Sequence, residues 1–121
     1  MKHILVVDDE PAITRLIKLN LESTGRYTVS TENRGSRAIE TARQSQPDLI
    51  LLDIMMPDML GSEVAAALHE DPALNHIKIV FLTAMLKKDE ARSSEEIGGQ
   101  RIIAKPISTD ELIQVIEEVL A

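Results

Sequence analysis

The stretch "ILVVDDEP", residues 4–11, places four large aliphatic residues directly before two aspartates, a glutamate and a proline. Consecutive apolar residues of this kind are typical of a strand buried on both faces, as in a parallel sheet. Proline is favoured at the first position of an α-helix, so the segment predicts a strand, a short acidic turn and a helix in succession. Two like charges at the end of a buried strand repel each other, so we expect the aspartates to have a role that offsets this loss of stability.

The rest of the chain repeats this alternation of strand and helix. Apolar runs predict strands at 3–7, 49–52, 77–82 and 102–104, with a more polar strand at 27–31. Apolar residues at helical spacing predict helices that include 13–21, 38–42, 64–68 and 112–120, and a weakly patterned helix at 86–97.

This alternation predicts an α/β fold, namely a flavodoxin-like (βα)5 doubly wound parallel sheet with helices on both faces. The first, third and fourth strands are apolar at nearly every position, so we expect them in the centre of the sheet. The second strand is more polar and the fifth is short, which suits the two edges. These features favour the strand order 2-1-3-4-5.

The composition restricts the function. The 121 residues fit one domain, spanning 1–121, which is either a whole protein or a piece of a longer one. The absence of cysteine excludes disulfides and thiolate metal sites, and the net charge of −7 argues against direct nucleic-acid binding. With no signal peptide and no apolar run near the length of a membrane helix, we expect a cytoplasmic protein without a membrane partner.

Polar side chains stand at the carboxyl ends of the predicted strands. Asp8 and Asp9 follow the first strand, and Asp53 follows the third. Thr83 follows the fourth, and Lys105 follows the fifth. Ligands of such sheets bind beyond the carboxyl ends of the strands, so we expect these side chains to converge.

The convergence of carboxylates indicates a bound cation. Two carboxylates about 5 Å apart repel by about 3 kcal/mol at an effective dielectric constant near 20. Oxygen ligands without cysteine or histidine suit a hard ion, above all Mg²⁺. Lys105 and Thr83 offer an ammonium and a hydroxyl to a phosphate, and Asp53 between the two halves is a candidate nucleophile towards phosphorus.

Each of these residues also has an ordinary structural interpretation. Asp8 or Asp9 could cap the first helix. Asp53 could open a turn, Thr83 could be an ordinary strand residue, and Lys105 could be a solvated charge. Together, these interpretations do not explain why polar strand ends gather at one edge of one sheet.

The chain resembles the response-regulator receiver domain of two-component signalling along nearly its whole length. The motifs that carry the resemblance are "VVDDEP" (6–11), "PDLILLDIMMPDMLG" (47–61), "LTA" (82–84) and "AKP" (104–106). The resemblance implies that Asp53 accepts a phosphoryl group from a sensor histidine kinase or a phosphotransfer protein. It implies a Mg²⁺ ion held by Asp8, Asp9, Asp53 and the backbone carbonyl of Met55.

The resemblance further implies that Thr83 acts as the switch hydroxyl, beside a small residue at Ala84, and that Lys105 binds the phosphoryl group. Such a domain catalyses only its own phosphorylation and dephosphorylation, and it acts on an output domain or target protein that the sequence does not identify. The Lys105–Pro106 bond corresponds to one that is commonly cis in the family.

The chain departs from the family near its fifth strand. Ile102 stands where the family usually has a tyrosine or phenylalanine that turns inward on activation, so a rotating ring is not available. Gln100–Arg101 replaces a usual acidic pair, and Ile107 replaces a frequent aromatic residue.

Two other functions remain open at this point. A Mg²⁺-dependent aspartyl-phosphate phosphatase or phosphotransferase usually carries a second aspartate two residues after the nucleophile, where this chain has Met55, which cannot move protons. A binding-only pseudo-receiver would not turn over phosphate, but the intact set of site residues argues against it. A phosphorylation assay on Asp53 and turnover of external phosphomonoesters separate these alternatives.

Overall fold

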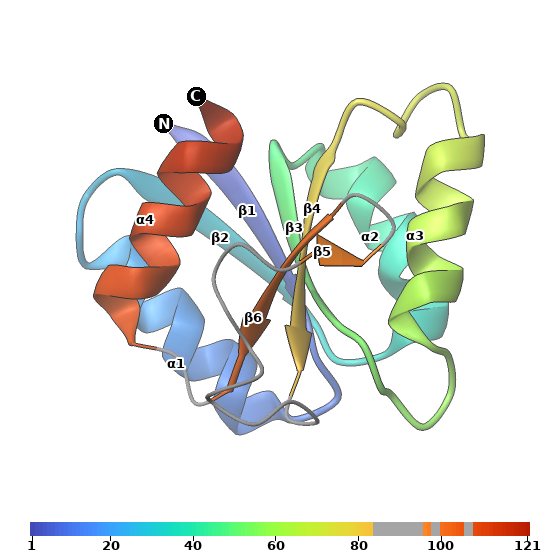
Figure 1. Ribbon diagram of the computed structural model, residues 1–121, viewed down its shortest axis with the longest axis horizontal. Helices are drawn as coiled ribbons and strands as arrows, with labels where there is room; N and C mark the ends of the chain where they lie inside the picture. The colour runs from blue at the N-terminus through green and yellow to red at the C-terminus, as the bar shows by residue number, and fades with distance from the viewer. Residues whose placement is uncertain (84–95, 98–99, 106–107) are drawn as a thin grey trace.

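A computed structural model describes residues 1–83, 96–97, 100–105 and 108–121. Figure 1 shows a central sheet with helices on both sides. The strands are β1 (Lys2–Val7), β2 (Tyr27–Glu32), β3 (Leu49–Asp53), β4 (Lys78–Thr83), β5 (Glu96–Ile97) and β6 (Gln100–Ala104). The helices are α1 (Pro11–Glu22), α2 (Ala38–Ser45), α3 (Gly61–Glu70) and α4 (Thr109–Leu120), with the short 3-10 helix η1 (Gly35–Arg37) before α2.

The sheet has the predicted topology. Its strand order is β2-β1-β3-β4-β6-β5, and β6 is the fifth strand of the sequence prediction. The pairs β1–β2, β1–β3, β3–β4 and β4–β6 are all parallel. The predicted order 2-1-3-4-5 is therefore confirmed for the parallel strands, and the fold is flavodoxin-like.

One segment differs from the prediction. The helix expected at 86–97 lies outside the described residues over 86–95, and it is wrong at its end, because Glu96 and Ile97 form the strand β5. This strand pairs antiparallel with Gln100 and Arg101 of β6, so β6 is not the outermost strand. In the sequence, Gly98 and Gly99 follow this strand, and a pair of glycines is compatible either with the end of a helix or with a turn between two strands.

Two apolar cores fill the space between the sheet and the helices. In Figure 1, α1 and α4 lie on one side of the sheet, and α2 and α3 lie on the other. The first core contains Ile17 and Leu21 of α1 with Leu112, Val115 and Ile116 of α4. Residues 4–7 of β1 and 49–52 of β3 are completely buried, which explains why these segments are apolar at every position.

The residues at the helix ends suit their positions, and the helix start predicted at Pro11 is found in the structure. Pro11 is the first residue of α1, and Gly25 in the following turn has a φ of +74°, which glycine adopts without strain. Ser108 precedes α4, and its side chain accepts a hydrogen bond from the Glu111 backbone N–H at 3.1 Å.

Among the described residues, no helix combines the length and the apolar character that a membrane crossing requires.

Candidate functional site

Three carboxylates meet at the carboxyl edge of the sheet. Asp8 and Asp9 directly follow β1, and Asp53 is the last residue of β3. The two strands are neighbours, with Val7 opposite Leu52, so the ends of both strands lie side by side. One oxygen from each carboxylate lies within 4.8 Å of the others. The structure therefore brings together the acidic residues that the sequence singles out.

Lys105 joins this group from the end of β6. Its Nζ lies 2.5 Å from Asp8 Oδ2 and 3.5 Å from Asp53 Oδ1. The Lys105 backbone N–H donates to the carbonyl of Thr83 at 2.8 Å, so the ends of β4 and β6 are held together. Thr83 itself is buried, with 2% of its surface exposed. The cation is thus close to two of the acidic side chains, and a hydroxyl residue stands beside it.

The electrostatic environment raises the pKa of Asp53 from 3.8 to about 6. Burial is the main cause, and the negative charge of Asp8 adds to it, while the positive charge of Lys105 acts in the opposite direction. For Lys105, burial by itself lowers the pKa, but the hydrogen bond and charge of Asp8 and the charge of Asp53 outweigh it, so the pKa is raised. Asp53 therefore resists ionisation in the metal-free protein, whereas Lys105 stays charged.

The two oxygens of Asp8 have different surroundings. Oδ1 accepts a hydrogen bond from the Glu10 backbone N–H at 3.0 Å, which supports the turn before α1. The capping role considered for Asp8 thus applies to the turn, because the residue that precedes α1 is Glu10. Oδ2 is buried, and its close partner is the Lys105 ammonium, 2.5 Å away. This oxygen therefore already faces a positive charge in the metal-free protein.

The donor set fits a divalent cation. Three ionised carboxylates and one lysine leave an excess of two negative charges, which one Mg²⁺ would neutralise. All the donors are oxygens, as this ion prefers. Asp8, Asp9 and Asp53 are the described residues that could hold it.

Other residues singled out from the sequence lie around this centre. The Met55 side chain is 52% exposed, and its backbone forms an isolated bridge with Leu60, in the loop that leads to α3. Ile102, which replaces the usual aromatic residue, is buried at 1% exposure in β6. Ala84, Pro106 and Ile107 lie outside the described residues, so the small-residue position and the cis bond are not addressed by the structure.

Gly61 is a site residue whose role the sequence did not reveal. A Cβ atom at this position would lie 2.4 Å from the backbone oxygen of Asp53, so only glycine allows the start of α3 to approach β3 this closely. The Gly61 N–H also donates to the carbonyl of Ile54 at 2.7 Å. Gly61 ends the quoted motif at 47–61, but its spacing alone did not indicate this contact.

Asn33 is a second residue that sequence reasoning missed. It directly follows β2, at the same edge of the sheet as Asp8, and its side-chain Nδ2 donates to the backbone carbonyl of Asp8 at 2.8 Å. With Asp9, Arg34 and Asp58 it lines a hollow of about 400 Å³ beside the acidic cluster. Its position could have indicated this role, because Asn33 is a polar residue close to the end of the second predicted strand, as Asp8 is for the first.

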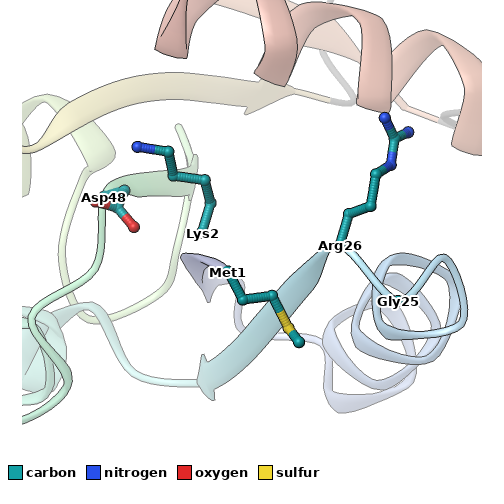
Figure 2. Close-up of a pocket in the computed structure, with 5 residues that line it drawn as sticks. All are labelled: Met1, Lys2, Gly25, Arg26 and Asp48. Atoms are coloured by element: carbon teal, nitrogen blue, oxygen red, sulfur yellow. The ribbon is translucent and has the colours of Figure 1, made fainter.

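A different hollow, of about 600 Å³, lies at the amino end of the sheet, away from the acidic cluster (Figure 2). Lys2 and Asp48 line one side, and the Arg26 side chain on the other side extends towards α4. Arg26 forms an ion pair with Glu117 at 3.4 Å, and Asp48 accepts a hydrogen bond from the His3 N–H at 2.8 Å. These contacts serve the fold, so the acidic cluster remains the candidate site.

Known proteins are similar to this chain in sequence and in fold. The family model described as "Response regulator receiver domain" matches residues 4–117. A polar-differentiation response regulator, DivK, from Brucella anthropi is 34% identical over 119 residues, which covers 98% of this chain and 96% of the relative.

Solved structures are similar as well. The chemotaxis protein CheY4 of Vibrio cholerae has a TM-score of 0.84 at 27% identity, with 99% of both chains covered. The N-terminal domain of a response regulator receiver protein from Methanoculleus marisnigri has a TM-score of 0.73 at 38% identity, covering 100% of this chain and 98% of that one.

Proposed function

The chain belongs to the response regulator receiver domain family, and from this membership we propose that it accepts a phosphoryl group on Asp53 with the help of Mg²⁺. The observation that carries the proposal is the meeting of Asp8, Asp9 and Asp53 with Lys105 at one edge of the sheet. Asp8, Asp9 and Asp53 would hold the ion, together with the backbone carbonyl of Met55. When bound, Mg²⁺ supplies positive charge that neutralises the carboxylates and the oxygens of the incoming phosphoryl group.

In the proposed step, a phosphoryl group passes from the donor to Asp53. An ionised oxygen of Asp53 forms a new bond to phosphorus, and the bond from phosphorus to the donor nitrogen or oxygen breaks, with its electron pair leaving on the donor. Asp53 has to be ionised for this attack. Its raised pKa in the metal-free protein implies that a cation, by stabilising the charged form, prepares the nucleophile as well as the electrophile.

Lys105 and Thr83 would contact the phosphoryl group once it is on Asp53. The Lys105 ammonium already stands 3.5 Å from Asp53 Oδ1, so a phosphoryl group on that carboxylate comes within its reach. Thr83 is joined to Lys105 through the backbone, and its hydroxyl would donate to a phosphoryl oxygen. A movement of Thr83 towards that oxygen would pass the signal to the segment that follows β4.

Receiver domains are generally non-enzymatic signalling domains that interact with histidine kinases and downstream targets. For this chain we propose a sensor histidine kinase or a phosphotransfer protein as the donor, an output domain or a separate protein as the target, and the cytoplasm as its location. The net charge of −7 disfavours direct contact with nucleic acid. Met55 cannot serve as an acid or base, so the chain would catalyse only its own phosphorylation and dephosphorylation.

Acetyl phosphate gives a direct test. With Mg²⁺, the wild-type protein should gain one phosphoryl group in intact-mass spectra, and peptide mapping should place it on Asp53. Asp53→Asn should abolish the gain and Asp9→Ala should reduce it strongly, whereas Asp110→Asn, at an exposed aspartate in α4, should react like wild type. Phosphate on another residue, or an unchanged gain in Asp53→Asn, would reject the proposal. Hydrolysis of external phosphomonoesters would favour a phosphatase instead.

A further inference from the structure

Asn33 links the ends of two neighbouring strands. Val7 of β1 stands opposite Glu32 of β2, and the Asp8 N–H donates to the Glu32 carbonyl at 3.1 Å. The next contact along the edge comes from a side chain, because Asn33 Nδ2 donates to the backbone carbonyl of Asp8 at 2.8 Å. A carbonyl oxygen can only accept a hydrogen bond, so this contact also settles which end of the Asn33 amide faces Asp8.

The same amide group holds the first turn of α1. Asn33 Nδ2 also donates to Thr14 Oγ1 at 3.0 Å, and the Thr14 hydroxyl donates to the carbonyl of Pro11 at 3.1 Å. Thr14 is buried, with 2% of its surface exposed. Both protons of the amide are therefore used, and they fix the residues on each side of the turn that carries Asp9.

Asn33 is in turn held from the other helical layer. Glu32 Oε2 accepts hydrogen bonds from the Asn33 N–H at 3.0 Å and the Arg34 N–H at 3.1 Å. Glu32 Oε1 accepts a hydrogen bond from Thr41 Oγ1 of α2 at 2.6 Å. These bonds brace the Asn33 backbone, so its side chain is presented to Asp8 from a fixed position.

We propose that Asn33 is a positioning residue for the divalent cation, an inference that rests on the proposed function. The Asp8 carbonyl belongs to the planar peptide that joins Asp8 to Asp9, so a hydrogen bond to that oxygen restricts the direction in which the Asp9 side chain leaves the backbone. Groups that hydrogen-bond to metal ligands typically change metal affinity by about 10–100-fold when they are removed. Asn33 would thus set Mg²⁺ affinity without touching the ion.

Calorimetry with Mg²⁺ alone tests this inference. Asn33→Ala and Asn33→Leu, the second of similar size to asparagine, should each raise the Mg²⁺ dissociation constant at least about tenfold. Asp48→Ala is the matched control, because it also removes a hydrogen bond from a side chain to the backbone of β1, but at the opposite end of the sheet, where Asp48 accepts from the His3 N–H. It should lower the melting temperature but keep Mg²⁺ affinity within about twofold of wild type.

A kinetic readout separates positioning from a structural defect. The Asn33 variants should need more Mg²⁺ for phosphorylation by acetyl phosphate, but their rate at saturating Mg²⁺ should return close to that of wild type. If neither Asn33 variant folds, Thr14→Val takes their place, since it removes one of the two acceptors of the amide and should raise the dissociation constant by a smaller factor.

The outcomes distinguish the two proposals. Unchanged Mg²⁺ affinity in the Asn33 variants, with binding lost in Asp9→Ala, would overturn the positioning role and leave the proposed function intact. An equal loss of affinity in Asp48→Ala would also overturn it, because the effect would then follow stability alone. If the wild-type protein binds no Mg²⁺, both the proposed function and the positioning role of Asn33 are wrong.

Discussion

The ammonium of Lys105 lies 2.5 Å from Asp8 Oδ2, at a point where Asp8 is completely buried. A buried ion pair repays the loss of hydration only when the charges are close and well partnered, and here one lysine faces a cluster of carboxylates. Lys105 therefore acts as the internal counter-ion of the metal-free protein. In the proposed phosphorylated state it would turn part of this contact towards the phosphoryl group.

Removing this counter-ion should destabilise the metal-free protein. Lys105→Met keeps most of the aliphatic stem but leaves Asp8 buried without its partner, which should cost about 3 kcal/mol of unfolding free energy. Mg²⁺ should stabilise this variant more than it stabilises wild type, because the ion would then supply the missing positive charge. Urea unfolding with and without Mg²⁺ measures both effects, and Lys2→Met, at an exposed lysine at the other end of the sheet, serves as control. Equal Mg²⁺ effects in all three proteins would contradict this account.

Mg²⁺ should also stabilise the wild-type protein. At a free concentration ten times the dissociation constant, linkage gives about 1.4 kcal/mol, which corresponds to a rise of about 5 °C in melting temperature for a domain of this size. Asp9→Ala should lose most of this rise while still folding, since Asp9 is half-buried and not part of the apolar core. Melting curves over a Mg²⁺ titration measure it, and a rise that persists in Asp9→Ala would place the ion elsewhere.

The sequence predicted the parallel sheet because its signals are local and strong. Residues 4–7 and 49–52 are apolar without interruption, and the structure buries them completely. The same reasoning brought Asp8 and Asp53 to one edge, since neighbouring parallel strands end together. The hydrophobic pattern and the rules of sheet topology were enough for the architecture and for the approximate place of the site.

What the sequence could not supply depends on contacts between distant residues. The hydrogen bond of Asn33 to the Asp8 carbonyl requires the register of two strands, which a single asparagine after a polar strand does not specify. The contact of Gly61 with the Asp53 backbone requires the path of the loop between them. The strand β5 was mistaken for the end of a helix, because Ile97 and the glycines after it fit either element.

Gly61→Ala should distort the loop between β3 and α3. The added methyl group would lie 2.4 Å from the Asp53 carbonyl oxygen and 2.9 Å from the Ile54 Cα atom, both of them backbone, so the chain has to move. We expect a loss of about 1–3 kcal/mol in unfolding free energy, and a slower phosphorylation by acetyl phosphate because Asp53 shifts with its backbone. Ser62→Ala, at the exposed neighbouring position, should leave both quantities near wild type. If Gly61→Ala behaves like this control, the close approach of α3 to β3 is incorrect.

The stability of the metal-free protein should depend on pH through Asp53. In the folded, metal-free protein the pKa of Asp53 is raised from 3.8 to about 6, so the folded state holds this proton more tightly than the unfolded state does. Well below pH 3.8 the carboxyl is protonated in both states and does not oppose folding, whereas from pH 3.8 to about 6 the unfolded state releases the proton first, and stability is lost.

Asp53→Asn should therefore stabilise the metal-free protein, and only at the higher pH values. Asparagine keeps the shape of the side chain but cannot ionise beside Asp8, so the difference in unfolding free energy between variant and wild type should be small at pH 4, grow through pH 6 and then level off. Urea unfolding from pH 4 to pH 8 in the presence of a chelator measures this difference. Added Mg²⁺ should reduce it, because the ion favours the ionised carboxylate of wild type. Profiles of variant and wild type that stay parallel across this range would show that Asp53 ionises without strain, and that repulsion at the acidic cluster does not prepare the site for a cation.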